Sequence, residues 1–337
     1  MRIDAMTPGR QIAVSRSTRQ QPARDHGFAL IAVIWIASLL AVVASVFTTS
    51  VRSTVRDVHA SVAMEEAAAL AETGINLVLL DAIKARASDA ARRFPADGTT
   101  LVCRTGDSDL LAIRLRDEAG KVDLNVAKAE LLHALFTGIG LKPSDADSVR
   151  DALADYKDSD DDQRLNGAEA ETYRQSGRPS GPKNAALDAV DELGQVYGMT
   201  SPLAARVRPF VTIHSGQDGV DPKAAAPELV ALLARGSEGD GGFAAVRLSD
   251  RAALPPAFVT ASAKRTFTIE AEAMTSRGAR YVREAIVNFT DRARQAEGAD
   301  AAGRRAPPLP VTILSWRRAT SFADVPSDRD PAEVPPC

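Results

Sequence analysis

The chain has few of the residues that catalysis requires. Its 337 residues include four histidines, and no two of them have the spacing of metal ligands. It contains no Gly-x-Ser-x-Gly, His-Glu-x-x-His or phosphate-loop motif. The net charge of −3 gives no general attraction to nucleic acid. The sequence therefore predicts a protein that is not an enzyme and does not bind nucleic acid.

Cysteine is almost as scarce, with Cys103 and Cys337 alone and far apart. Two cysteines cannot form a disulfide framework, although they could pair in an oxidising compartment. Cys337 ends a segment, 319–337, that is rich in Pro and Asp and typical of a disordered tail. The sequence therefore favours two unpaired thiols.

One stretch, residues 28–47, lacks charged side chains altogether. A helix of this length crosses a hydrocarbon core of about 30 Å with its backbone hydrogen bonds satisfied. Basic residues outnumber acidic ones before it, which favours a cytoplasmic N-terminus. The sequence predicts a single membrane-spanning helix over 28–50, with most of the chain on the far side. The charged residues that precede it are Arg2, Asp4, Arg10, Arg16, Arg19, Arg24 and Asp25.

The start of the apolar stretch, Gly27-Phe28, is unusual. An ordinary signal anchor fits it, and a secretory signal cleaved near Ala44 to Val46 stays open. The junction also resembles the type IV pilin and pseudopilin class. In that class a prepilin peptidase removes the leader, here 1–27, and methylates the new N-terminus, here Phe28.

The fifth residue after this junction is Ala32, and no acidic residue follows before Asp57. Most pilins have a Glu at that position, where a charge within the bilayer is costly unless it is paired. In those families it pairs with the terminal ammonium of a neighbouring subunit. A subunit with Ala32 cannot make that pair with a subunit above it, so we expect it at the end of a filament.

Beyond the membrane stretch, the pattern predicts an α+β head. Apolar residues at helical spacing and the lack of proline between Phe28 and Pro95 predict one helix from Phe28 to about Ala90, or two helices joined near Gly74. The part of this helix beyond residue 50 and the first strands occupy 51–120. The closing strands occupy 263–318. The apolar residues of the helical pattern are Val51, Val55, Val58, Val62, Leu70, Leu77 and Leu80; the predicted strands are 101–104, 110–116, 265–274, 279–290 and 311–317.

Between these strands, residues 121–262 are mostly helical in pattern, which predicts an insertion into the head. An internal echo also appears: 122–135, VDLNVAKAELLHAL, resembles 220–233, VDPKAAAPELVALL. The echo indicates a duplicated helical module.

The chain as a whole resembles the K-type minor pseudopilins of type II secretion systems. The resemblance covers about 27–318 and is specific because its motifs occur in order. It implies a pseudopilin fold, with a long N-terminal transmembrane helix, a small antiparallel sheet and a large inserted α-helical domain of SAM-like units. It also implies anchoring in the inner membrane with the head in the periplasm, and a place at the pseudopilus tip with minor pseudopilins I and J. The motifs are the Gly27-Phe28 junction, 71–76, 120–125, 155–169, the second Val-Asp-Pro unit, and the closing FTIEAEA and ILSWRR segments.

The densest group of candidate ligands lies in 158–169. Counted from Asp158, oxygen-bearing side chains fall at positions one, three, five, nine and twelve, the order of a calcium loop. Gln163 stands where an EF-hand needs Gly, so the loop is not a standard EF-hand. A solvated acidic loop is the alternative, and calcium binding in the K-type family favours the metal. The expected ligands are Asp158, Asp160, Asp162 and Glu169, with Asp161 and Asn166 in reserve.

A second segment, Thr137 to Gly140, resembles the helix–hairpin–helix of DNA-uptake and repair proteins. Such hairpins present backbone N–H groups to phosphate. Only Lys142 is basic nearby, against Asp145, Asp147 and Asp151, so DNA affinity should be weak. The hairpin nevertheless leaves one alternative to the pseudopilin, a membrane-anchored DNA-binding protein.

Overall fold

The computed structural model describes residues 26–88, 92–106, 108–237, 254–289, 311–322 and 333–337. The chain divides into two compact units, Met1–His59 and Ala60–Cys337. The predicted leader lies almost entirely outside the described residues.

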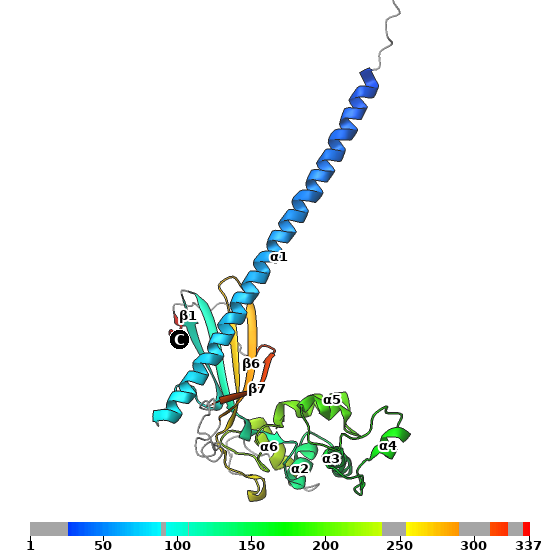
Figure 1. The fold of residues 1–337 in the computed structure, drawn as a ribbon, viewed down its shortest axis with the longest axis vertical. Helices are drawn as coiled ribbons and strands as arrows, with labels where there is room; N and C mark the ends of the chain where they lie inside the picture. The colour runs from blue at the N-terminus through cyan, green and yellow to red at the C-terminus, as the bar shows by residue number, and fades with distance from the viewer. Residues whose placement is uncertain (1–25, 89–91, 107, 238–253, 290–310, 323–332) are drawn as a thin grey trace, which may run out of the picture. The chain divides into compact units, whose positions relative to one another are not determined.

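The longest element is α1, His26–Ser88, which is one continuous helix (Figure 1). No proline occurs between Pro22 and Pro95, so nothing in this stretch removes a helical hydrogen bond. The alternative of two helices joined at Gly74 is wrong. Gly74 is instead a point of close contact, because a Cβ there would lie 2.9 Å from the Cβ of Ala271 in the sheet.

The face of α1 that is buried against the sheet consists mainly of small residues. Ala71, Ile75, Val78 and Ala82 lie in the same core as strand residues of the head. Two residues of the predicted stripe, Leu70 and Leu77, are partly buried against this core. Val58, Val62 and Leu80 are exposed. Small side chains at three- and four-residue spacing allow the helix axis to lie close to the sheet, which larger ones would prevent.

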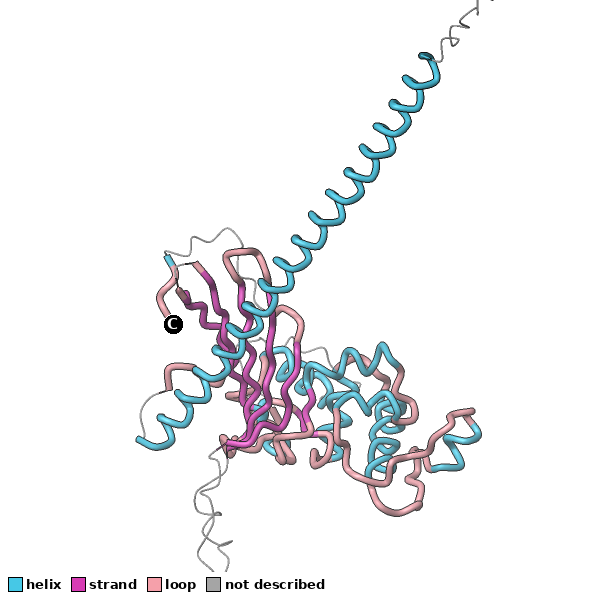
Figure 2. The backbone as a smooth tube through the Cα atoms, turned by 45° about the horizontal axis from the view of Figure 1, so that its top comes forward, coloured by secondary structure: helices cyan, strands magenta, loops and turns pink. Residues whose placement is uncertain are grey.

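Five antiparallel strands form the sheet that α1 crosses (Figure 2). The strand order is β1-β2-β5-β6-β7, and the predicted hairpin of β5 and β6 is confirmed. β2 and β5 are neighbours in the sheet, although about 150 residues separate them in sequence. The strands are β1 Asp97–Thr105, β2 Asp109–Asp117, β5 Thr266–Met274, β6 Arg280–Phe289 and β7 Val311–Arg318.

The helical segment between β2 and β5 has a hydrophobic core of its own, built around Leu131, Leu135, Leu153 and Leu233. The sheet and α1 share a different core. The head is therefore α+β, with an antiparallel sheet and an inserted helical part; its SAM-like character stays a prediction. The elements are η1 Glu118–Gly120, β3 Val122–Asp123, α2 Ala129–Gly138, α3 Pro143–Lys157, α4 Ala170–Gln175, η2 Val190–Gln195, α5 Ser201–Val207, η3 Arg208–Phe210, β4 Val211–Thr212, α6 Pro227–Ser237 and η5 Pro256–Phe258.

A buried carboxylate joins the insertion to the sheet. Glu118 is 1% exposed and accepts hydrogen bonds from Lys121, from Thr212 of β4 and from Thr268 of β5. Burial opposes ionisation, but Lys121 and the two hydroxyls outweigh it and hold the pKa of Glu118 below its usual value. The Glu118 carboxylate thus stabilises the junction between the two cores.

The two copies of the internal echo are related by matching contacts. Val122 and Val220, which begin the copies, each form a parallel bridge, to Val211 and Val259 respectively. Further along, α2 and α6 approach each other at equivalent glycines. A Cβ on Gly138 would lie 2.1 Å from the carbonyl oxygen of Leu232, and one on Gly236 would lie 1.8 Å from that of Ala134. These contacts are exchanged between the copies, since Ala134 and Leu232 are also equivalent. They agree with the duplication, which stays a prediction.

We expect Gly236→Ala to lower the free energy of unfolding by about 1–3 kcal/mol, because the added methyl overlaps the backbone of α2. Alanine gains about 1 kcal/mol of helix propensity over glycine, which offsets only part of that cost. Gly194→Ala is the matched control, since a Cβ there meets nothing within 4 Å, and it should change stability by less than about 0.5 kcal/mol. Denaturant unfolding of the full chain in detergent measures both, and equal stabilities would contradict the close crossing.

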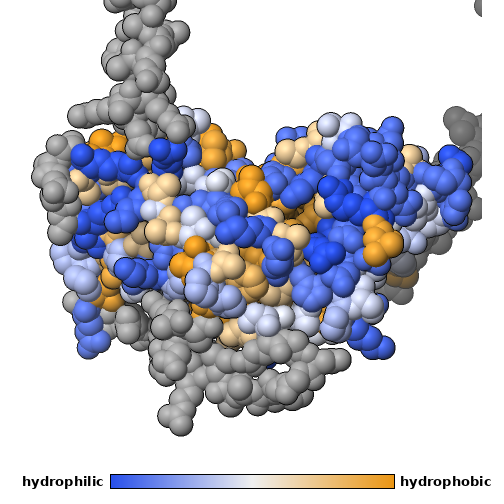
Figure 3. All heavy atoms as spheres, turned by 90° about the horizontal axis from the view of Figure 1, so that it is seen from below, coloured by the Kyte–Doolittle hydropathy of each residue, from blue (hydrophilic) through white to orange (hydrophobic). Residues whose placement is uncertain are grey.

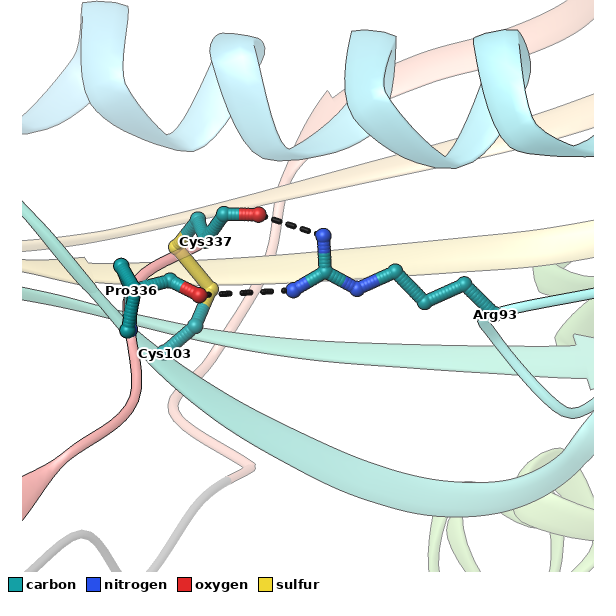
Figure 4. The surroundings of a disulfide bond; sticks show 4 residues. All are labelled: Arg93, Cys103, Pro336 and Cys337. Atoms are coloured by element: carbon teal, nitrogen blue, oxygen red, sulfur yellow. Dashed lines mark hydrogen bonds between the residues drawn. A yellow bond between two sulfur atoms is a disulfide. The ribbon is translucent and has the colours of Figure 1, made fainter.

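The end of the chain is held against β1, contrary to the expected free thiols and disordered tail. Cys337 forms a disulfide with Cys103 of β1 (Figure 4). The N–H of Arg104 donates to Pro335 at 2.7 Å, and the N–H of Cys337 donates to the Arg104 carbonyl at 3.0 Å. Arg93 also donates hydrogen bonds to the carbonyl oxygens of Pro336 and Cys337. The sequence left this pairing open but did not favour it, because 234 residues separate the two cysteines.

The first residues after β7 are also fixed. The N–H of Ala319 donates to Val282, and the N–H of Phe322 donates to the carboxylate of Glu272 in β5. Val334 is buried against Leu110 and Ala112 of β2. The described parts of the predicted tail, 319–322 and 333–337, are therefore ordered by contacts with the sheet.

Candidate functional site

The predicted acidic loop connects α3 to α4, and its residues lie in different environments. Asp158 directly follows α3 and is half-buried, whereas Asp160, Asp161 and Asp162 are exposed. Glu169 directly precedes α4 and is buried. The loop therefore has a buried end at Glu169 and a solvated middle.

An arginine occupies part of the space that the sequence assigned to a metal. Arg164 forms ion pairs with Asp158 and with Asp155, a fully buried residue of α3. These hydrogen bonds raise the pKa of Arg164, so the guanidinium stays charged. Asp155 also accepts the N–H of Ala168 at 2.9 Å, and a Cβ on Gly167 would lie 1.9 Å from Asp155 Oδ2. Two of the carboxylates are thus neutralised by the chain itself.

Glu169 is different, because neither of its carboxylate oxygens has a hydrogen-bond partner among the described residues. Burial, followed by the nearby charges of Asp155, Asp158 and Asp161, raises the pKa of Glu169 above its usual value. Asp158 Oδ1 and Asn184 Oδ1 are also buried without a partner in the described structure. Buried oxygens without donors, next to a surplus of negative charge, favour a bound cation.

The side chains of the loop do not gather into the calcium site that their order in the sequence predicts. Within the described residues, no three or more His, Cys, Asp or Glu side chains are gathered in a position to hold one metal ion. Asp160 accepts the N–H of Asp162 at 3.1 Å, which makes a local turn. Asn166 donates to Asp151 instead. Calcium binding at this loop therefore stays a prediction. The buried oxygens of Glu169 and Asp158 that have no partner among the described residues are the ones that a cation would contact.

Sequence reasoning missed two residues of this site. Asp155 lies in the acidic segment, but its helical position concealed that its side chain turns into the loop. Asn184 lies outside the loop, has a positive φ of 51°, and donates to Asp161 at 3.1 Å. No sequence pattern links Asn184 to the loop, because its contact arises only from the tertiary fold.

The hairpin at the end of α2 uses its backbone donors internally. The N–H groups of Ile139, Gly140 and Leu141 donate to the carbonyls of Leu135, Thr137 and Phe136. Gly140 has a φ of +103°, as expected for a residue that ends a helix. These three N–H groups are therefore satisfied within the chain.

The N-terminal part of α1 has the length and hydropathy of a membrane-spanning helix. Leu30–Thr48 has a mean hydropathy of 2.7, and none of this segment is buried within the protein. Ala32 lies in this segment, and Gly27 and Phe28 lie just before it in α1. Among the described residues, this is the single helix that is long and apolar enough to span a bilayer.

In α1, an apolar segment of membrane-spanning length continues into a stretch that packs on a small antiparallel sheet. Residues 109–216 match the family model "Type II secretion system (T2SS), protein K". This match covers β2 and most of the insertion. The resemblance to type II secretion system protein K, expected from the sequence, is therefore confirmed.

Curated relatives agree with this match. The chain is 32% identical over 85 residues to a putative type II secretion system protein K of Escherichia coli (strain K12). It is 27% identical over 129 residues to type II secretion system protein K of Pectobacterium carotovorum subsp. carotovorum. These alignments cover 25% and 37% of this chain, and they span only 26% and 39% of the relatives' lengths.

The fold is similar to that of GspK in the crystal structure of the GspK-GspI-GspJ complex from enterotoxigenic Escherichia coli. The TM-score is 0.50 at 16% sequence identity, and the match covers 80% of this chain and 99% of that one. At this identity the likeness shows the fold, namely helices with an antiparallel sheet.

Proposed function

We propose that this chain is a minor pseudopilin of a type II secretion system, anchored in the inner membrane with its head in the periplasm. The carrying observation is that the apolar segment Leu30–Thr48 and the stretch packed on the sheet belong to one helix, α1. Such a helix links a lipid-embedded end to a folded head. The view in Figure 3 supports an aqueous location for the head, since its surface there is mainly hydrophilic with small, separate apolar groups.

Two features favour a position at the tip of the pseudopilus. Ala32 provides no carboxylate to pair with the terminal ammonium of a subunit above it. The insertion between β2 and β5 adds a second folded body to the head, which would obstruct further stacking. The chain would cap the filament, help to start its assembly for protein export, and act as a structural subunit rather than an enzyme.

Its expected partners are the minor pseudopilins I and J, since the solved relative is a complex of GspK with GspI and GspJ. Other pseudopilins would contact the apolar half of α1. Co-purification of the full chain with I and J from detergent-solubilised membranes tests this part. We expect a stable ternary complex, and a chain that binds neither protein would overturn the proposed function.

The proposal includes calcium as a structural ion. Glu169 would provide the central ligand, because its two oxygens lack donors, and Asp158 and Asp161 would complete the acidic side of the site. Asp160, Asp162 and Asn166 would take part only if the exposed middle of the loop closed. Calcium would supply positive charge that offsets the repulsion among these carboxylates.

Processing at the Gly27-Phe28 junction gives a separate prediction. Co-expression with a prepilin peptidase should yield a chain that begins with methylated Phe28, as measured by intact-protein mass spectrometry. Gly27→Leu should retain the leader, because the peptidase of this class cuts after glycine. Gly9→Leu, elsewhere in the leader, is the control and should be processed normally. An intact leader on the unmodified chain would instead support a plain signal anchor.

A further inference from the structure

The two edges of the five-stranded sheet are treated differently. At one end of the β1 edge, Arg104 exchanges backbone hydrogen bonds with Pro335 and Cys337, and the disulfide at Cys103 fixes this contact. β7 forms the opposite edge, and β6 is its one strand neighbour in the described structure. An edge strand presents backbone N–H and C=O groups that can pair with another strand. Within the described residues, one end of the β1 edge is paired, whereas β7 has no second strand neighbour, so its backbone is the one open to a partner strand.

The side chains of β7 also fit a binding edge. Ile313 is 50% exposed, Leu314 43% and Trp316 39%. β7 contains neither lysine nor proline, the residues that commonly prevent edge pairing, and its charges are confined to Arg317 and Arg318 at its end. Exposed apolar and aromatic side chains on both faces of an edge strand provide anchors for a partner strand.

The charge at the end of β7 indicates the chemistry of that partner. Arg317 is paired with Glu284 at 2.7 Å, and Arg283 is paired with Glu72 at 2.8 Å beside the ring of Trp316. Arg318 lies 5.0 Å from the ring centre of Tyr281 and has no carboxylate partner among the described residues. A carboxylate would complement this exposed guanidinium.

We propose that the open edge of β7 binds an extended strand of a minor pseudopilin partner by β-strand addition, with an acidic side chain of that strand at Arg318. The backbone of β7 supplies the pairing groups, Ile313 and Trp316 supply the apolar contacts, and Arg318 sets the end of the register. This proposal rests on the proposed function, because it identifies the surface by which the partner is held.

The test compares full-length variants in the complex with I and J. Ile313→Lys places a charge on the edge and should weaken binding by at least about tenfold. Its matched control is Leu165→Lys, at a residue of the insertion that is 95% exposed, which should change affinity by less than about twofold. Arg318→Glu should weaken binding, whereas Arg174→Glu, in exposed α4, should not. Both Ile313→Lys and Leu165→Lys should keep the melting temperature of the unmodified chain.

Amide hydrogen exchange distinguishes strand pairing from a side-chain contact. We expect exchange at 311–318 to slow when the complex forms, and this protection to be absent in Ile313→Lys. A complex that forms with unchanged exchange at 311–318, or that Ile313→Lys and Leu165→Lys affect equally, would overturn strand addition while leaving the proposed function in place. If the unmodified chain forms no complex with I or J, the proposed function fails and this inference fails with it.

Discussion

Replacing both Cys103 and Cys337 by serine is expected to lower the free energy of unfolding of the head by about 2–5 kcal/mol. The disulfide closes a loop across 234 residues, so its removal frees a large part of the unfolded chain from a constraint. The folded state also loses apolar contacts, because Val334 in the tail is buried against β2 and the disulfide holds this tail in place.

Thermal and denaturant unfolding of the full chain, oxidised and then reduced, measures this effect. The double serine variant should match the reduced unmodified chain, and reductant should not change the variant further. Replacing Arg93 by alanine is the matched control for the surrounding hydrogen bonds, since it keeps the disulfide but removes the donors to Pro336 and Cys337. It should cost about 0.5–1.5 kcal/mol. Loss of less than about 0.5 kcal/mol in the double variant would show that the tail does not stabilise the sheet.

The second large effect concerns Glu169 and calcium. In the unmodified chain, calcium at about 100 times its Kd should raise the free energy of unfolding by about 2.7 kcal/mol. Glu169→Gln should abolish most of this gain, because it removes the ligand whose oxygens lack donors. Glu171→Gln, which removes a charge from an exposed position of α4, is the matched control and should keep the gain.

The same variant has a pH signature in the absence of calcium. Because burial and neighbouring aspartates raise the pKa of Glu169, this group contributes stability below its unfolded pKa of about 4.3 and loses it as the pH rises through the folded value. Glu169→Gln does not undergo this loss, so it should be more stable than the unmodified chain at pH 7 and similar to it near pH 4. If calcium still stabilised Glu169→Gln, Glu169 would not be the ligand proposed here, and calcium would have to bind elsewhere in the loop.

Much of the fold could be predicted from local patterns. The apolar run, the absence of proline and the alternating strand patterns predict α1 and the sheet, because helix continuity and strand alternation depend on residues close together in the sequence. The buried face of α1 could be predicted only in part. Hydrophobicity indicated Leu70 and Leu77, which pack against the sheet core, but it also indicated Val58, Val62 and Leu80, which are exposed. It did not indicate Ala71 and Ala82, which close packing on the sheet buries.

The parts that were missed depend on distant contacts. The disulfide joins Cys103 of β1 to Cys337, and the sequence near Cys337 does not indicate that its segment lies beside β1. At the acidic loop, spacing identified Asp158 and Glu169 but could not indicate that Arg164 would pair with Asp155 and Asp158. The sequence gives the order of the carboxylates along the loop. Which positive group pairs with them, here the guanidinium of Arg164, depends on the tertiary fold.

We propose above all that this chain lies at the end of the pseudopilus and not along it. The most direct measurement is electron microscopy of assembled pseudopili in which a gold-binding tag marks this chain in the insertion. We expect gold label at one end of each filament. Label repeating along the shaft would contradict it.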